Sequence, residues 1–397
     1  MVKVGDSLER GRLLLQMGRP EEAERQLRGV LAEEPQHAGA HALLGLALVQ
    51  QGRTDEAREE SNESVRLAPD QYVTHYLAGQ VLYQARLVDE AARAIAACLQ
   101  LEPEYAPAWE LLARVNMARR DWAQMAEAAE RGLAAEPQNA DLASLLALAL
   151  TQLGQDERAR AAAAQAVGND PESALAHWAY GRAALGTGDP KTAAESFREV
   201  LRLDPGFDSA RDHLVHALKQ RNPVYRLLSR LSFRVSWRLL FLLPALPPVI
   251  AVFILSALLH WAAWIAEAAT TLRLARAKST RLLFEGSAAR VALLCCGVLA
   301  AGAALLGVGI GLGQDGVSVA GVAVMALITP IQEAAHTGSP VGRRILSGWA
   351  ILLAAVVAAG LVTLSFPVGI LTAYTALATI WIASGVRKIF RPREAAA

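Results

Sequence analysis

The chain has 397 residues and a formal net charge of only +1, but its two halves differ sharply in charge. Residues 1–218 hold 22 Lys and Arg against 33 Asp and Glu, whereas residues 219–397 hold 17 against 5. The acidic N-terminal half argues against nucleic acid as a partner, because the phosphate backbone attracts basic surfaces. The three cysteines have neither the number nor the spacing of a disulfide framework or a zinc site, and we expect no cofactor.

Prolines recur every 34 residues through the first half of the chain. A fixed period of about 20 to 50 residues is typical of repeat proteins. The residue 24 positions before each proline is Gly or Ala, and the residue 12 positions before it is Ala in five of six periods. Small residues at both places let two helices cross closely, so each period predicts a helical hairpin. The prolines are Pro35, Pro69, Pro103, Pro137, Pro171 and Pro205.

These residues resemble the tetratricopeptide repeat family, whose period is about 34 residues. The resemblance covers residues 1–207 as six repeats, with Met125 and Ala129 departing from the pattern in the fourth, and residues 208–221 are expected to form a capping helix. It implies an all-α superhelix that binds a protein or peptide in its concave groove and is not an enzyme. By the family's register, the groove positions are Tyr76, Gln80, Tyr83, Gln84, Glu110, Arg114, Met117, Gln152, Trp178 and Arg182.

Residues 222–243 are basic and amphipathic, with arginines spaced four apart so that they share one face of a helix. Such a helix is expected to lie on the surface of an anionic leaflet. An equally good interpretation is a positively charged flank of a membrane segment, without a specific lipid role. The arginines are Arg226, Arg230, Arg234 and Arg238.

Residues 244–390 are mostly apolar, and a membrane-spanning helix needs about 20 such residues. We therefore expect a multi-pass bundle of about five transmembrane helices, followed by a short cytoplasmic tail at residues 391–397. The third run reaches spanning length only if it extends toward Ala335. The five runs are Val249–Ala266, Ala288–Leu312, Val317–Ile331, Ile345–Phe366 and Val368–Val386.

The turns at residues 314–316 and 365–367 have no basic residue, whereas arginines flank the opposite ends of the last four runs. Because cytoplasmic loops are enriched in Lys and Arg, this pattern predicts two hairpins whose ends lie in the cytoplasm. The first run has basic residues on both sides. Residues 233–266 therefore either cross once after an interfacial helix or turn back near Pro244, which would add a sixth segment.

Glu333 and His336 form a Glu-x-x-His pair in the third run. Di-metal helical bundles use two such pairs with two further carboxylates, so we expect no metal here and treat both residues as weak candidates only. Alternating glycines at Gly307, Gly309, Gly311 and Gly313 are expected to let membrane helices pack closely.

The resulting hypothesis is a scaffold or adaptor anchored in a bacterial inner membrane, with cytoplasmic repeats that bind a protein partner. A bacterial source is suggested by the Ala-, Arg- and Leu-rich composition, and residues 1–6 hold no apolar export signal. The expected partners are a protein segment and the lipid bilayer, without nucleic acid, and an oligomer is compatible with the sequence. The alternative is a multi-pass transport or metal-dependent membrane protein in which the repeats are regulatory.

Overall fold

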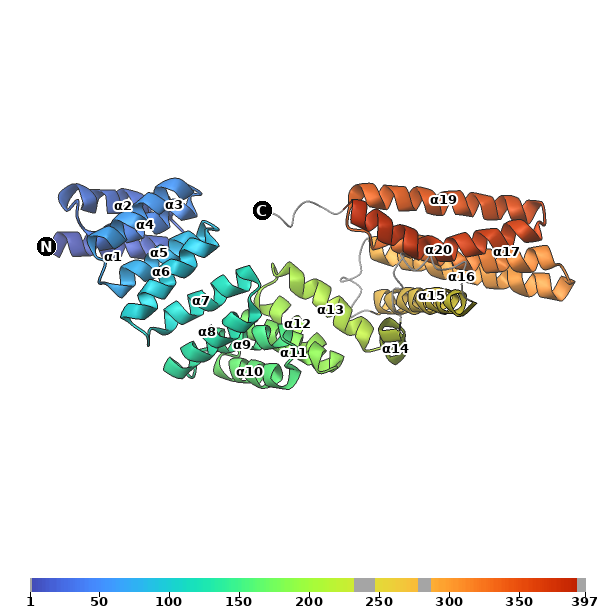
Figure 1. The fold of residues 1–397 in the computed structure, drawn as a ribbon, viewed down its shortest axis with the longest axis horizontal. Helices are drawn as coiled ribbons and strands as arrows, with labels where there is room; N and C mark the ends of the chain where they lie inside the picture. Colours follow the sequence, from blue (N-terminus) through green and yellow to red (C-terminus); the bar gives the residue numbers. More distant parts are fainter. Residues whose placement is uncertain (1, 232–246, 278–286, 391–397) are drawn as a thin grey trace. The chain divides into compact units, whose positions relative to one another are not determined.

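The computed structural model describes residues 2–231, 247–277 and 287–390. Within these ranges the chain forms twenty α-helices and no strand, which confirms the all-α prediction (Figure 1). The chain divides into two compact units, Met1–Leu214 and Val215–Ala397. The division falls within α13 (Asp208–Gln220), the helix predicted to follow the last repeat.

Six antiparallel helix pairs make up the first unit, and successive pairs pack against each other (Figure 1). The predicted number and order of hairpins are confirmed. The pairs are α1 (Val2–Gln16) with α2 (Pro20–Glu33), α3 (Ala38–Gln50) with α4 (Thr54–Leu67), α5 (Tyr72–Gln84) with α6 (Val88–Leu101), α7 (Ala106–Arg119) with α8 (Trp122–Ala135), α9 (Ala140–Gln152) with α10 (Asp156–Asn169), and α11 (Ala174–Gly186) with α12 (Pro190–Leu203).

The small residues of the repeat lie where the two helices of a pair cross. At Gly181 a β-carbon would come within 2.6 Å of the Phe197 ring, so no larger residue fits beside that phenylalanine. In the fourth pair, Met125 and Ala129 are fully buried in the core formed by α7, α8 and α9. The two residues by which the fourth repeat departs from the pattern therefore pack inside the core of that repeat.

The turn inside each hairpin contains one residue in the left-handed conformation, again at intervals of 34 residues. Four of the six positions are glycine, but the third and fourth pairs place Arg86 (φ 64°) and Arg120 (φ 59°) there. This conformation costs a residue with a β-carbon about 1–2 kcal/mol. The two central hairpins thus carry backbone strain that the outer four do not have at this position.

The repeating prolines have a second role that the sequence analysis did not identify. Their carbonyl oxygens accept hydrogen bonds from a ring nitrogen six residues further on, in the first turn of the next helix. Four pairs use this contact, which ties the turn between repeats to the helix that follows it. The donors are His41 Nε2 to Pro35 (3.0 Å), His75 Nε2 to Pro69 (2.8 Å), Trp109 Nε1 to Pro103 (2.7 Å) and His177 Nε2 to Pro171 (2.9 Å).

The second unit holds the apolar helices. Four stretches of the described residues are long and apolar enough to cross a membrane: Ala288–Leu312, Asp315–Ala335, Pro340–Val362 and Phe366–Ile389. The third predicted run does extend to Ala335, but it is divided at Leu327 into two consecutive helices. The helices are α14 (Pro223–Leu231), α15 (Pro247–Arg276), which contains the first predicted run, α16 (Ser287–Leu312), α17 (Asp315–Ala326), α18 (Ile328–Ala335), α19 (Pro340–Val362) and α20 (Phe366–Ile389).

Part of the membrane-surface prediction falls outside the described residues. Arg226 and Arg230 lie on α14, but Arg234 and Arg238 are in the range 232–246, as is the proposed limb of a hairpin before Pro244. The predicted tail, residues 391–397, is also outside. These parts of the sequence-based picture remain predictions.

The two turns without basic residues lie at the same end of the helical bundle. Gly316, at the start of α17, packs so closely on the backbone of Leu364, after α19, that a β-carbon would not fit. Because α16 pairs with α17 and α19 with α20, the arginines that flank these helices lie at the other end (Figure 1). The two hairpins predicted from the charge pattern are therefore present.

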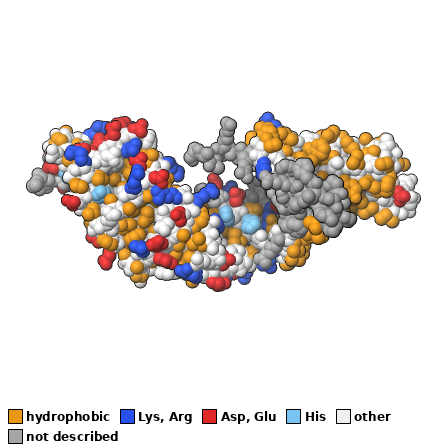
Figure 2. All heavy atoms as spheres, in the orientation of Figure 1, with side chains coloured by type: hydrophobic (Ala, Val, Ile, Leu, Met, Phe, Trp, Pro, Cys, Tyr) orange, Lys and Arg blue, Asp and Glu red, His pale blue; other side chains and the backbone are white. Residues whose placement is uncertain are grey.

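The segment formed by α17 and α18 lies inside the bundle, whereas α16 and α19 lie outside. Two-thirds (67%) of its most apolar window is buried, against 17% for α16 and 22% for α19. Gly302 of α16 lies against the Gly321 carbonyl of α17 without room for a β-carbon, as expected of small residues between membrane helices. Gly307 and Gly311 instead face open space. The outer face is largely hydrophobic in Figure 2, unlike the mixed charges over the repeats.

Candidate functional site

A groove lies between α5 and α7, the first helices of the third and fourth pairs. Its cavity has a volume of about 310 Å³. Each helix contributes residues spaced three or four apart, which share one face of a helix. Six of the ten predicted groove residues line it, together with Pro107 and Leu111, which the sequence analysis missed although they share the register of Glu110. The lining is Tyr76, Gln80, Tyr83, Gln84, Pro107, Glu110, Leu111 and Arg114.

Tyrosines build the α5 side of the groove. The Tyr76 ring meets Tyr105 edge to face, with 5.1 Å between ring centroids, and Tyr72 contacts the same ring at 5.0 Å. The Gln80 amide Nε2 donates a hydrogen bond to the Tyr76 hydroxyl at 2.8 Å. Burial raises the pKa of Tyr76 to about 12. The groove therefore presents a neutral phenol held in one position, next to the half-buried Tyr83.

An ion-pair network forms the α7 side. The Arg114 guanidinium donates to the Glu110 carboxylate at 2.7 Å and to the Asp141 carboxylate on α9 at 3.0 Å. Burial raises the pKa of Glu110 above its usual value, and the nearby Arg114 charge only partly opposes this. Two carboxylates therefore share the positive charge of one arginine. Because negative charge exceeds positive charge in this network, the floor of the groove favours ligand groups that donate hydrogen bonds or carry positive charge.

The other four predicted groove residues lie elsewhere. Met117 packs on the core of the fourth pair, and Gln152 is exposed at the end of α9. Trp178 is only 9% exposed and contacts the rings of Phe197 (5.4 Å) and Phe207 (5.0 Å). The Arg182 guanidinium lies over the Trp178 ring at 5.7 Å, and burial lowers its pKa. Trp178 and Arg182 form a separate cluster on α11.

The weak metal candidates, Glu333 and His336, have different partners. Glu333 is fully buried and pairs with Arg387 of α20. His336 instead contacts the Glu267 carboxylate of α15 at 3.2 Å, and Lys219 Nζ approaches the same carboxylate at 2.7 Å. Within the described ranges, no three His, Cys, Asp or Glu residues come together as metal ligands would. The Glu-x-x-His pair therefore does not converge on one point.

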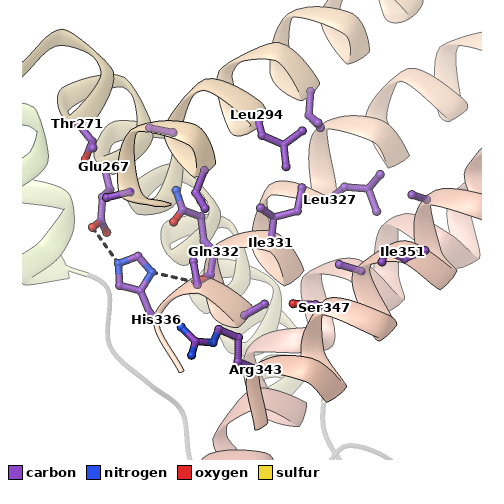
Figure 3. A pocket seen from close by; sticks show the side chains of 18 of the residues that line it. Glu267, Thr271, Leu294, Leu327, Ile331, Gln332, His336, Arg343, Ser347 and Ile351 are labelled. Carbon is purple, nitrogen blue, oxygen red and sulfur yellow. Dashed lines mark hydrogen bonds and ion pairs between the residues drawn. The ribbon is translucent and has the colours of Figure 1, made fainter. Parts of the chain in front are cut away.

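A second and larger cavity, of about 560 Å³, lies within the second unit (Figure 3). It is bounded by α15, α16, α18 and α19. Glu267, His336 and Arg343 lie at one end, and aliphatic side chains including Leu294, Leu327 and Ile351 lie at the other. The sequence analysis did not predict it, because its walls come from segments far apart in the chain.

Comparison with known proteins finds a likeness to one family within the first unit. Residues 8–72, 117–174 and 145–206 match a family model described as tetratricopeptide repeat. Similar solved structures include pilF of Pseudomonas aeruginosa (24% identity, 54% of this chain and 97% of that chain, TM-score 0.47) and a thermophilic repeat protein of Thermus thermophilus (19% identity, 46% and 98%, TM-score 0.39). No curated protein matches the sequence.

Proposed function

Since the N-terminal unit of this chain consists of tetratricopeptide repeats, we propose that the protein is a membrane-anchored adaptor. The repeats hold a segment of a partner protein, and the apolar helices of the second unit fix the chain in the membrane. The observation that supports this most directly is the groove between α5 and α7.

The chemistry of the groove favours a protein segment. Tyrosine and arginine are the residues that most often dominate protein interfaces, and here they alternate with the amides of Gln80 and Gln84. Peptide backbones offer both donors and acceptors to such amides, and the Glu110 and Asp141 carboxylates suit a basic side chain or a backbone N–H. The bound segment is therefore expected to be extended, with an apolar or basic anchor.

Tyr83→Ala combined with Arg114→Ala is expected to remove the partner from material purified with the full chain. Truncating an interface hot spot costs about 2 kcal/mol or more, which is roughly a thirtyfold loss of affinity for each residue. The measurement is quantitative mass spectrometry of proteins captured from detergent extracts. Arg93→Ala is the matched control, since Arg93 is exposed on α6 of the same pair but outside the groove. Identical partner profiles for the double variant and the wild type would contradict the groove assignment.

We place the repeats on the cytoplasmic side of a bacterial inner membrane. The support is the segregation of charge in the second unit: the turns at Gln314 and Ser365 have no basic residue, and arginines such as Arg343 and Arg387 lie at the other end. Cytoplasmic loops carry this excess of positive charge.

Reporter fusions test this topology. A reporter at Gln314 and one at Ser365 are expected to signal the periplasm, while one after Arg393 signals the cytoplasm, because each apolar segment crosses once. Each site is fused in turn to a phosphatase, which is active in the periplasm, and to a fluorescent protein, which is active in the cytoplasm. The two signals are expected to be opposite at every site, so each reporter controls the other. The same compartment for Gln314 and Arg393 would rule out two complete hairpins.

Glu333 and His336 do not support the alternative of a metal-dependent membrane protein, because their side chains pair with Arg387 and Glu267 respectively. Transport through the second unit has no specific observation in its favour. The large cavity of that unit points to a different role, which follows.

A further inference from the structure

The cavity of the second unit is large enough to hold a ligand. Its volume of about 560 Å³ is within the range of about 300–1,000 Å³ that ligand sites usually have. It is lined by residues of α16 and α19 and by the inner helix α18, and Figure 3 shows Leu294, Ile331 and Ile351 among them. Leu294 and Ile351 line it and are also more than half exposed, so the cavity opens on the outer, apolar face of the bundle.

The two ends of the cavity differ in chemistry. At one end lie three basic side chains, Lys219, His336 and Arg343, with a single carboxylate, Glu267. The rest of the wall is mostly aliphatic, with Thr271, Gln332 and Ser347 as the polar exceptions. A ligand that fits both ends has an anionic head and an apolar tail.

The charges at the polar end do not balance. Glu267 is already shared by Lys219 at 2.7 Å and His336 at 3.2 Å. Arg343 forms no ion pair within the described part of the chain. Its guanidinium can donate a fork of hydrogen bonds, a geometry that matches a phosphate group. Among the described residues, the basic end of the cavity therefore carries more positive than negative charge.

The position of the polar end also fits a lipid. Arg343 lies in the first turn of α19, at the end of the bundle that carries the arginines. In the topology proposed above, this end faces the cytoplasmic leaflet, whose surface carries anionic head groups. The aliphatic wall then runs from the head-group level into the acyl-chain region, between two helices whose outer faces are apolar.

We propose that this cavity is a binding site for one anionic phospholipid, with its phosphate beside Arg343 and His336 and an acyl chain along Leu294, Leu327 and Ile351. The inference rests on the membrane insertion proposed above, but not on the protein-binding groove. A free anion would leave the aliphatic wall uncovered, and the choline group of a zwitterionic lipid would bring a positive charge close to Lys219 and Arg343.

The test is native mass spectrometry of the delipidated full chain, titrated with phosphatidylglycerol or with phosphatidylcholine of the same acyl chains. One phosphatidylglycerol is expected to remain bound at the lowest concentrations. Arg343→Gln is expected to weaken its retention about fivefold, the effect of one basic residue near a charged membrane surface. Arg344→Gln is the matched control, because Arg344 is the exposed neighbour of Arg343 on α19 but does not line the cavity.

A second matched pair tests the apolar end. Ala354 and Ala355 are both exposed on α19, but only Ala354 lines the cavity. Ala354→Trp is expected to fill the tail region and weaken phosphatidylglycerol retention, while Ala355→Trp leaves it unchanged. Thermal unfolding of each variant identifies any loss that comes from misfolding.

Three outcomes would overturn the proposal: equal effects of Arg343→Gln and Arg344→Gln, equal retention of the two lipids, or displacement of phosphatidylglycerol by inorganic phosphate at similar concentration. Alkaline extraction of membranes separates these failures from a failure of the proposed function. A chain that resists extraction but retains no lipid contradicts only this site. A chain that is extracted contradicts the membrane anchor itself.

Discussion

Arg387→Ala is expected to destabilise the second unit by about 3–5 kcal/mol, the usual cost of removing one partner of a buried ion pair. The carboxylate that pairs with Arg387 belongs to Glu333, which is fully buried on α18, the inner segment of the bundle. Arg387 is near the end of α20 and reaches it from a helix 54 residues later in the chain. The pair thus fixes α20 against α18 at the basic end of the bundle.

Arg387 and Glu333 differ in their exposure to solvent, so substitutions of the two residues are expected to differ in their effect on stability. Arg387 has a side chain that is 23% exposed, so its charge can reach water or lipid head groups when Glu333 is neutral. Glu333→Gln is therefore expected to cost less than Arg387→Ala. Combining the two substitutions is expected to restore part of the stability that Arg387→Ala removes, because the buried side chain at position 333 then carries no charge.

Thermal unfolding in detergent, followed by tryptophan fluorescence, measures these differences. Lys388→Ala is the control, since Lys388 is the exposed basic neighbour of Arg387 and forms no ion pair with Glu333 in the described part of the chain. Equal midpoints for Arg387→Ala and Lys388→Ala would show that the ion pair contributes nothing beyond the charge of the helix end.

The second large effect concerns the repeats. Phe197→Ala is expected to cost about 3–5 kcal/mol, the usual loss when a fully buried aromatic ring is truncated. The ring fills the space over Gly181 and contacts Trp178 and His213, so the cavity left by the substitution lies between α11, α12 and α13. Because each repeat contacts only its neighbours, the loss is expected to concentrate in the last repeats.

Hydrogen exchange of the full chain resolves the location as well as the size of this effect. Peptides from α11 and α12 are expected to lose protection, while those from α1 to α4 keep it. Leu101→Ala removes an exposed leucine (43%) at the end of α6 and should change neither region. Uniform loss of protection along all six pairs would mean that the array unfolds as one cooperative unit, against the expectation for a nearest-neighbour stack.

The 34-residue period was sufficient to predict the helix pairs because it reflects two local requirements, a proline between pairs and small residues at the crossing. The same logic failed to identify the left-handed turns at Arg86 and Arg120. An arginine carries no local signal for that conformation, so its backbone is set by the packing of the two helices that it joins.

The positions of the candidate residues were predictable only where they depend on one face of a single helix. Tyr76, Gln80 and Tyr83 fall in the groove because the helical register places them there. At Trp178 the register was right, but neighbouring rings cover the side chain, which a pattern of residue types does not reveal. The basic end of the second cavity joins Lys219 with Glu267 and His336, three segments whose approach depends on tertiary packing alone.

The groove lies midway along the repeat array, with two pairs before it and two after it. In a stack held by nearest-neighbour contacts, the angle between α5 and α7 sets the direction of everything on either side of that step. Any change of that angle would therefore move the first two pairs farther than it moves Tyr83 and Arg114 themselves, because displacement grows with distance from the step.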